Sequence, residues 1–141
     1  MNKRFFSVLI IVFLLTGIVL PATAVENRSS YYVKSYYAYL TQGNKRGEIV
    51  LNYNVRGTQL NATIIGVRKI EVYTTNGSLY RTIFGTTANG LIRASGNLAE
   101  GTYSIICAPN TYYYAIVTVI AGDTAGSNSH DTTTNTVRSY P

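Results

Sequence analysis

The 141-residue chain has one cysteine, one histidine and no tryptophan, and only 13% of its residues are charged. A lone cysteine cannot form an intrachain disulfide. Cys107 lies in an apolar run, which is typical of a small buried side chain, while a reactive or intermolecular thiol stays an alternative. The low content of charged residues argues against intrinsic disorder. With one histidine and six acidic residues in all, the chain offers few catalytic groups, and we expect no enzyme activity.

The amino terminus has the three parts of a secretory signal peptide. Lys3 and Arg4 form a basic start, an apolar run extends from Phe5 to Leu20, and the small-residue motif Ala22-Thr23-Ala24 follows Pro21. The run is shorter than the ~20 residues that span a bilayer. The pattern predicts a signal peptide over residues 1–24, with Ala22 and Ala24 forming the cleavage motif. The protein is therefore expected to be secreted, with contact to a membrane only before cleavage and association with the cell wall as an option.

Once residues 1–24 are removed, ten basic and six acidic residues remain, a formal charge of +4. Lys45-Arg46 and Arg68-Lys69 are the only adjacent basic pairs, and neither is the dense patch that nucleic-acid binding requires, so we expect no nucleic-acid partner. Residues 25–35 are predicted to be a flexible segment, and residues 36–141 a single domain.

The mature chain has the composition and periodicity of strands. It contains thirteen tyrosines together with many threonines, valines and isoleucines. The clearest strand is 48–56, where apolar Ile49, Leu51, Tyr53 and Val55 alternate with mostly polar neighbours. The range 112–121 is apolar on both faces and is predicted to be a central, covered strand. Further strands are expected at 31–42, 64–74, 78–84, 91–93, 102–107 and 129–137.

Turn residues separate these strands. Asn76-Gly77 predicts a tight hairpin with positive φ at both central residues. Turns or loops are also expected at 43–47, 57–62, 98–101 and 122–128. No helical periodicity follows the signal peptide. The pattern predicts an all-β, antiparallel two-sheet sandwich of about seven strands.

The segment from Gly101-Thr102-Tyr103 through Tyr112-Tyr113-Tyr114 to Gly122 resembles the late strands of fibronectin type III and related immunoglobulin-like sandwiches. The likeness covers about 30 residues and extends to a small-residue loop, here Ala125-Gly126-Ser127. It implies an immunoglobulin-like fold, in which one of Tyr112, Tyr113 and Tyr114 forms a tyrosine corner with its hydroxyl bonded to nearby backbone. Fold alone implies no particular function.

The whole chain is also similar to a family of short exported Gram-positive bacterial proteins of unknown function. The features that carry this resemblance are the tyrosine-rich start, Ile65-Gly66, the range 70–73, Asn76-Gly77-Ser78, the range 112–115 and the closing range 133–137. The resemblance implies a secreted product and brings no catalytic residues or cofactor.

Other site types find little support. His130 and Asp131 are neighbours on a predicted strand, so their side chains point to opposite faces and do not converge on a ligand or substrate. Asp123 and Asp131 with nearby serines fall short of the six or more oxygens that calcium prefers. No catalytic triad or paired carboxylates stand out, so no catalytic residue, metal or cofactor is predicted.

The excess of tyrosine is the one feature with functional promise. Tyr31, Tyr32, Tyr37 and Tyr39 are the weak candidates for ligand binding, because exposed aromatic rings stack on sugars and are favoured at protein interfaces. The alternative is that these rings only stabilise cross-strand pairs. Three hypotheses follow. The first is an exported, non-enzymatic sandwich that acts by surface contact, with a wall polymer or an extracellular protein as partner. The second is a carbohydrate-binding or wall-polymer-binding module, and the third is a secreted antimicrobial protein. Weak hydrolase activity is the most distant option.

Overall fold

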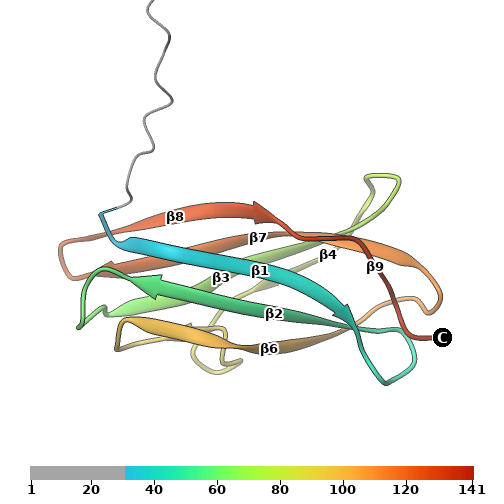
Figure 1. Cartoon of the computed structure of the whole chain (residues 1–141), viewed down its shortest axis with the longest axis horizontal. Helices are drawn as coiled ribbons and strands as arrows, with labels where there is room; N and C mark the ends of the chain where they lie inside the picture. The colour runs from blue at the N-terminus through green and yellow to red at the C-terminus, as the bar shows by residue number, and fades with distance from the viewer. Residues whose placement is uncertain (1–30) are drawn as a thin grey trace, which may run out of the picture.

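The computed structural model describes residues 31–141, which fold into two antiparallel β-sheets packed face to face (Figure 1). The three-stranded sheet, here sheet A, has the order β1-β2-β6, with β1 (Val33–Gln42), β2 (Glu48–Gly57) and β6 (Leu98–Ile106). The larger sheet, sheet B, has the order β4-β3-β7-β8, with β3 (Ile64–Thr74), β4 (Leu79–Phe84), β7 (Tyr112–Asp123) and β8 (Gly126–Thr133). Two short strands also belong to sheet B: β5 (Ile92–Arg93) pairs with β3, and β9 (Val137–Arg138) pairs with β7.

The all-β, two-sheet sandwich predicted from the sequence is therefore confirmed. Three strands facing four, in this order, is the arrangement of immunoglobulin-like sandwiches. Of the three candidate tyrosines, Tyr113 behaves as a tyrosine corner: it is buried, and its hydroxyl oxygen accepts a hydrogen bond of 3.2 Å from the backbone N–H of Ala108. The predicted signal peptide, with its cleavage motif at Ala22 and Ala24, lies outside the described residues.

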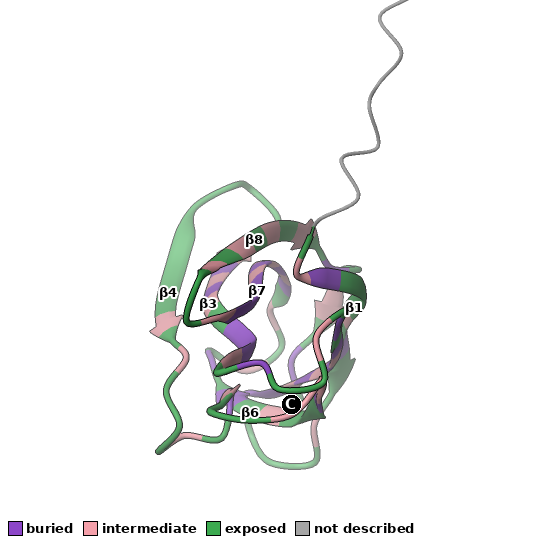
Figure 2. Cartoon of the chain, turned by 90° about the vertical axis from the view of Figure 1, so that its left-hand side faces the viewer, coloured by how far each residue is buried: buried purple, intermediate pink, exposed green. Residues whose placement is uncertain are grey.

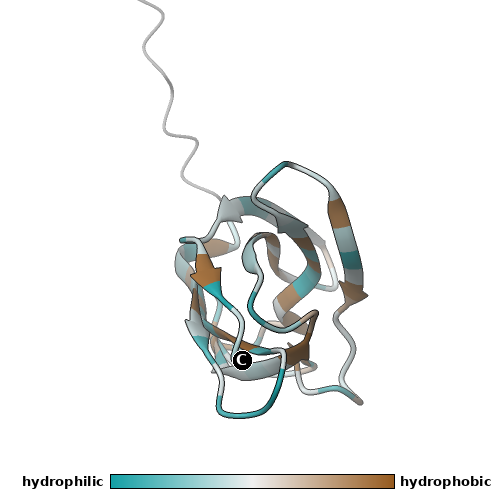
Figure 3. Cartoon of the chain, turned by 90° about the vertical axis from the view of Figure 1, so that its right-hand side faces the viewer, coloured by the Kyte–Doolittle hydropathy of each residue, from teal (hydrophilic) through white to brown (hydrophobic). Residues whose placement is uncertain are grey.

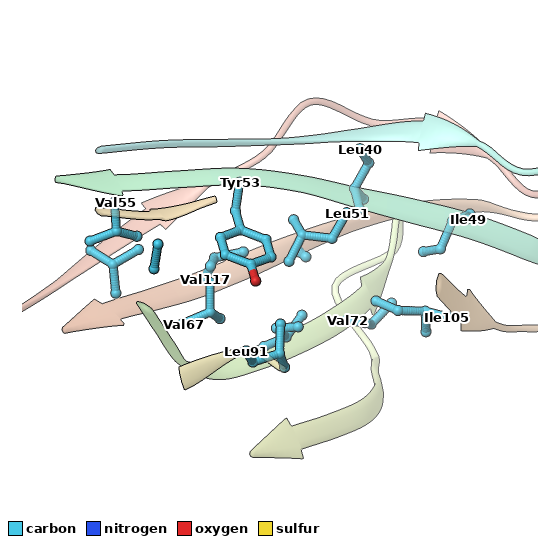
Figure 4. Close-up of a cluster of buried hydrophobic side chains, with 14 of the residues drawn as sticks. Leu40, Ile49, Leu51, Tyr53, Val55, Val67, Val72, Leu91, Ile105 and Val117 are labelled. Atoms are coloured by element: carbon cyan, nitrogen blue, oxygen red, sulfur yellow. The ribbon is translucent and has the colours of Figure 1, made fainter. Parts of the chain in front are cut away.

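The core is formed by alternate residues of the facing strands. Ile49, Leu51, Tyr53 and Val55 of β2 are all buried, as the alternation predicted. Their side chains meet those of sheet B, such as Val67, Val72 and Val117 (Figure 4). On β7 the same rule holds: its inward residues are buried, whereas on the outward side Tyr112 is exposed, Tyr114, Ile116 and Thr118 are half-buried and Ile120 is buried. The prediction that both faces of this strand are covered is thus correct for the inward face and, on the outward face, only at Ile120.

Strand pairing moves several predicted boundaries. The predicted turn 98–101 is the first part of β6, because Leu98 to Gly101 pair with Arg56 to Tyr53 of β2. Likewise β8 begins at Gly126 inside the predicted 122–128 loop, since Gly126 pairs with Asp123 across a tight turn. At the other end β1 begins at Val33, so residues 33–35 of the expected flexible segment belong to a strand. In the first two cases hydrogen bonds to a neighbouring strand outweigh the local turn-like composition, and in the third the strand expected over 31–42 prevails over the flexible segment.

The β3–β4 hairpin forms where Asn76-Gly77 predicted it, with a different turn. Gly77 has a φ of 85°, and Asn76 is not among the residues with positive φ. The N–H of Gly77 donates to the carbonyl of Thr74 at 2.9 Å, and the N–H of Thr74 donates to Ser78 at 3.0 Å. This is a three-residue loop that ends in a left-handed glycine, so positive φ is needed at one position and not at two.

Candidate functional site

Tyr37 and Tyr39 lie on the outward side of β1. Because successive side chains of a strand alternate, Tyr36, Ala38 and Leu40 turn toward the core while these two tyrosines turn to solvent. Their exposed fractions are 55% and 44%, and their rings lie 6.1 Å apart with an angle of 28° between the planes. Two nearly parallel, solvent-exposed rings therefore stand next to each other on a rigid strand.

Polar side chains continue the surface from this pair across sheet A. The register places Tyr37 beside Asn54 and Tyr39 beside Asn52 on β2, and Glu100 and Thr102 follow on β6, one strand further across the sheet. The Asn54 amide donates to Glu100 at 2.9 Å, and that of Asn52 donates to Thr41 at 3.1 Å. These bonds orient the amides across the strands. We call this surface the tyrosine face; it consists of Tyr37, Tyr39, Thr41, Asn52, Asn54, Glu100 and Thr102.

A groove of about 380 Å³ continues the tyrosine face toward the β1–β2 turn. Thr102 belongs to both surfaces, and the next row of the sheet, Thr41, Val50 and Ser104, leads into the groove. The remaining lining residues are Gln42, Gly43, Asn44 and Glu48. The side chains that line it are mostly amides and hydroxyls, with one carboxylate.

That carboxylate, Glu48, holds the turn in place. The alternation of β2 assigned Glu48 to the solvent side, yet the residue is only 5% exposed. One carboxylate oxygen hydrogen-bonds the hydroxyl of Ser104, and the other accepts from the N–H groups of Asn44 and Lys45 at 2.9 and 3.1 Å. The Ser104 hydroxyl first, and then the two N–H groups, lower the pKa of Glu48 because they stabilise its charged form.

The structure separates the four candidate tyrosines into two pairs. Tyr31 and Tyr32 contact each other edge to face, with ring centroids 4.9 Å apart, just before β1. Tyr31 is exposed, but Tyr32 packs against the core, and its hydroxyl lies close to Gly126. Burial, and then the neighbouring carboxylate of Asp123, raise the pKa of the Tyr32 hydroxyl. Tyr32 is thus a packing residue at the β7–β8 turn, and only Tyr37 and Tyr39 form a shared exposed surface.

His130 and Asp131 point away from each other on β8. The His130 ring stacks on Tyr36 of β1, with centroids 5.5 Å apart and an angle of 19°. Asp131 instead accepts a hydrogen bond of 2.6 Å from the hydroxyl of Thr118 on the outward side of sheet B. Among the described residues, no group of three or more histidine, cysteine, aspartate or glutamate side chains could hold a metal ion.

Cys107 is a buried free thiol. Burial raises the pKa of its thiol to about 11, and nearby Arg81 offsets only part of that effect. Since the thiolate is the reactive form, this side chain is poorly suited to nucleophilic chemistry near neutral pH. Its burial agrees with the interpretation of Cys107 as a small apolar residue.

Sheet B carries surface features that the sequence did not single out. Tyr73 and Tyr114 are register partners on its outward side, stacked at 5.4 Å with an angle of 14°. A groove of about 370 Å³ lies on the same sheet and is lined by Arg68, Lys69, Phe84, Thr118, Ser129 and Asp131. Alternation assigned residues to faces within one strand, but only the register between strands brings these side chains together.

Comparison of the chain with models of known families, with curated proteins and with solved structures finds no match. Within residues 31–141, no helix is long and apolar enough to cross a bilayer. The candidate site therefore rests on the geometry of the tyrosine face.

Proposed function

We propose that this protein is an exported, non-enzymatic β-sandwich that acts by surface contact outside the cell, and that the tyrosine face is its contact surface. The amino-terminal sequence supports export. The observation that carries the choice of surface is the pair of adjacent exposed rings, Tyr37 and Tyr39, flanked by oriented amides. Exposed rings on a rigid strand bind with little loss of side-chain entropy.

Carbohydrate or cell-wall polymer is the ligand class that fits these groups best. The apolar faces of sugar rings pack on aromatic rings, while their hydroxyls need donors and acceptors arranged around those rings. Asn52 and Asn54 supply such groups next to the two tyrosines, and Glu100 and Thr102 add others on the following strand. The groove that continues past Thr102 adds further amides and hydroxyls along the same face, which suits an extended chain better than a single sugar.

The proposal is tested by retention of the mature protein on purified cell walls and on insoluble polysaccharides. We expect Tyr37→Ala/Tyr39→Ala to weaken binding about 10-fold or more, because each lost ring contact is worth roughly 1 kcal/mol. The matched control is Tyr112→Ala/Tyr140→Ala, since these rings are 53% and 41% exposed, close to the values for Tyr37 and Tyr39, and do not belong to the tyrosine face. This control is expected to bind like the wild type.

Two results would count against the proposal in different ways. Equal retention of both double variants would mean that the polymer binds elsewhere on the molecule. Absence of retention on every wall and polysaccharide preparation would remove carbohydrate as the ligand class, and an extracellular protein partner would then replace it as the hypothesis for the same face.

A further inference from the structure

The groove of about 370 Å³ on the outward side of sheet B reaches from β4 to β8. One row of the strand register crosses it and contains, in order, Phe84, Lys69, Thr118 and Asp131. Figure 2 shows β4, green, at one margin of this sheet, and β8, banded green and pink, at the other. The volume lies near the lower end of the range for small-molecule sites, about 300–1,000 Å³. The groove is therefore large enough for a small ligand.

A β-bulge brings two consecutive cations to this groove. The pairing of β3 with β7 changes register between Val67 and Lys69, so Arg68 is the additional residue of the bulge. In a regular strand the side chains of Arg68 and Lys69 would point to opposite sides of the sheet, yet both line the groove. Bulges redirect side chains in this way, often beside functional sites.

The aromatic wall of the groove is fixed by the same bulge. The N–H of Gly85 donates to the carbonyl of Arg68 at 2.8 Å, and a Cβ at Gly85 would overlap the carbonyl oxygen of Val67, so only glycine fits there. The Asn89 amide donates to the Phe84 carbonyl at 2.9 Å. Figure 3 shows that this end of β4 is hydrophobic, and the Phe84 residue is 67% exposed. A ring on a fixed backbone thus faces solvent at the margin of the groove.

One cation and one anion of the groove have no partner of opposite charge. The ion pair of residues 31–141 joins Lys69 to Glu71 at 3.1 Å, and it includes neither Arg68 nor Asp131. One carboxylate oxygen of Asp131 accepts from the Thr118 hydroxyl at 2.6 Å, and the other makes no hydrogen bond to a described residue. The groove therefore has an available guanidinium on β3 and an available carboxylate oxygen on β8.

We propose that this groove binds a peptide of two or three residues with both of its ends free. The terminal carboxylate pairs with Arg68 and Lys69, the terminal ammonium pairs with Asp131, and the last side chain packs on Phe84. Strands β3 and β8 lie two strand spacings apart, about 9.6 Å, and three residues of extended chain span about 10 Å. The Thr118 hydroxyl, between the two charges, still has lone pairs that accept from a peptide N–H.

The two charges select against simpler ligands. A polyanion brings negative charge to the carboxylate of Asp131, and a polycation brings positive charge to Arg68. A single amino acid has its ammonium and its carboxylate on the same carbon atom, so it cannot reach both ends of the row at once. The site does not depend on the proposed function, because the tyrosine face lies on the other sheet.

An NMR titration of the isotopically labelled mature protein with the tripeptide alanyl-alanyl-phenylalanine tests the proposal. We expect a Kd of about 1 mM and shifts of the amide resonances of Lys69, Thr118 and Asp131. Acetylation of the amino end and amidation of the carboxyl end each remove one charge. Each should weaken binding about 3- to 5-fold, as expected for the loss of an exposed ion pair.

Variants of the two unpaired charges should each affect one of these preferences. Arg68→Gln should reduce the preference for the free over the amidated peptide and keep that for the free over the acetylated peptide. Asp131→Asn should do the reverse. The matched control, Arg56→Gln, removes an exposed arginine from sheet A and should keep both preferences. A merely structural role of Arg68 or Asp131 would not produce this crossed pattern.

Three results would overturn the proposal. The first is the absence of shifts along the groove at tripeptide concentrations up to about 10 mM, which covers weak specific binding. The second is equal binding of the free, acetylated and amidated peptides, or preferences that neither groove variant changes. The third is binding of free phenylalanine as tightly as the tripeptide, because the site would then recognise a single amino acid.

Discussion

Two stacked tyrosine pairs lie on the outward sides of the two sheets, and they differ in how they are built. Tyr73 and Tyr114 come from neighbouring strands, β3 and β7, and both are half-buried. Tyr37 and Tyr39 come from one strand, β1, and both are exposed. A ring pair that bridges two strands stabilises the pairing of those strands, whereas a ring pair within one strand does not hold two strands together. The comparison separates tyrosines that serve the fold from tyrosines left free for contact.

The largest expected effect comes from removing the bridging pair. Tyr73→Ala/Tyr114→Ala should lower the free energy of unfolding by about 2 kcal/mol, because it deletes a cross-strand aromatic contact and half-buried apolar surface. Tyr37→Ala/Tyr39→Ala should lower it by less than about 0.5 kcal/mol, as expected for surface positions. Urea denaturation at neutral pH measures both. Equal losses of stability would erase the distinction between the pairs.

The coupling energy between the two rings should also differ between the two pairs, by less than the total loss of stability does. A double-mutant cycle on Tyr73 and Tyr114 is expected to give a coupling energy of about 1 kcal/mol, within the range for aromatic pairs. The same cycle on Tyr37 and Tyr39 should give a few tenths of a kcal/mol at most, because a ring distance of 6.1 Å leaves less contact than 5.4 Å. A stronger coupling for the exposed pair would instead show that it contributes to the fold.

The stability of the protein is expected to depend on pH through Glu48, at the groove end of the tyrosine face. The pKa of Glu48 in the folded protein lies below its ordinary value of 4.5, so the unfolded chain takes up the proton first. The stabilisation that Glu48 provides is complete above 4.5 and is lost as the pH falls through the lower folded-state pKa. Glu48→Gln should reduce stability at pH 7 and flatten this part of the profile.

The matched control for that prediction is Glu100→Gln, which changes an exposed carboxylate of the same face. The Glu100→Gln variant should keep nearly the wild-type stability at pH 7, since Glu100 is exposed and surface substitutions usually have small effects. A Glu48→Gln unfolding profile that runs parallel to that of the wild type from about pH 3 to pH 7 would mean that the turn does not depend on the charged carboxylate.

The elements that could be predicted from sequence are those whose signal lies within one segment. The alternation of β2 identified its core residues, and Asn76-Gly77 located a hairpin, because side-chain direction and turn geometry are local properties. The start of β6 at Leu98 was missed, since it depends on pairing with β2. The burial of Glu48 was missed for a similar reason, because Ser104, which hydrogen-bonds its carboxylate, is brought to it only by the pairing of β2 with β6.

The candidate site shows the same limit. Four tyrosines were candidates, and only the register between strands distinguishes Tyr37 and Tyr39 from Tyr32, which is held against the core near Gly126. The exposure of Phe84 and the edge position of β4 also depend on strand order, which periodicity within a strand does not encode. Residue type indicated which side chains could bind, and topology decided which of them are available.

The most direct test of the proposed contact surface is a titration of the isotopically labelled mature protein with a soluble fragment of the polymer that retains it, followed by NMR. We predict shifts at Tyr37, Tyr39, Asn52 and Asn54, with the resonances of Tyr73 and Tyr114 unchanged. Shifts confined to the outward side of sheet B, or spread evenly over both sheets, would contradict the assignment of binding to the tyrosine face.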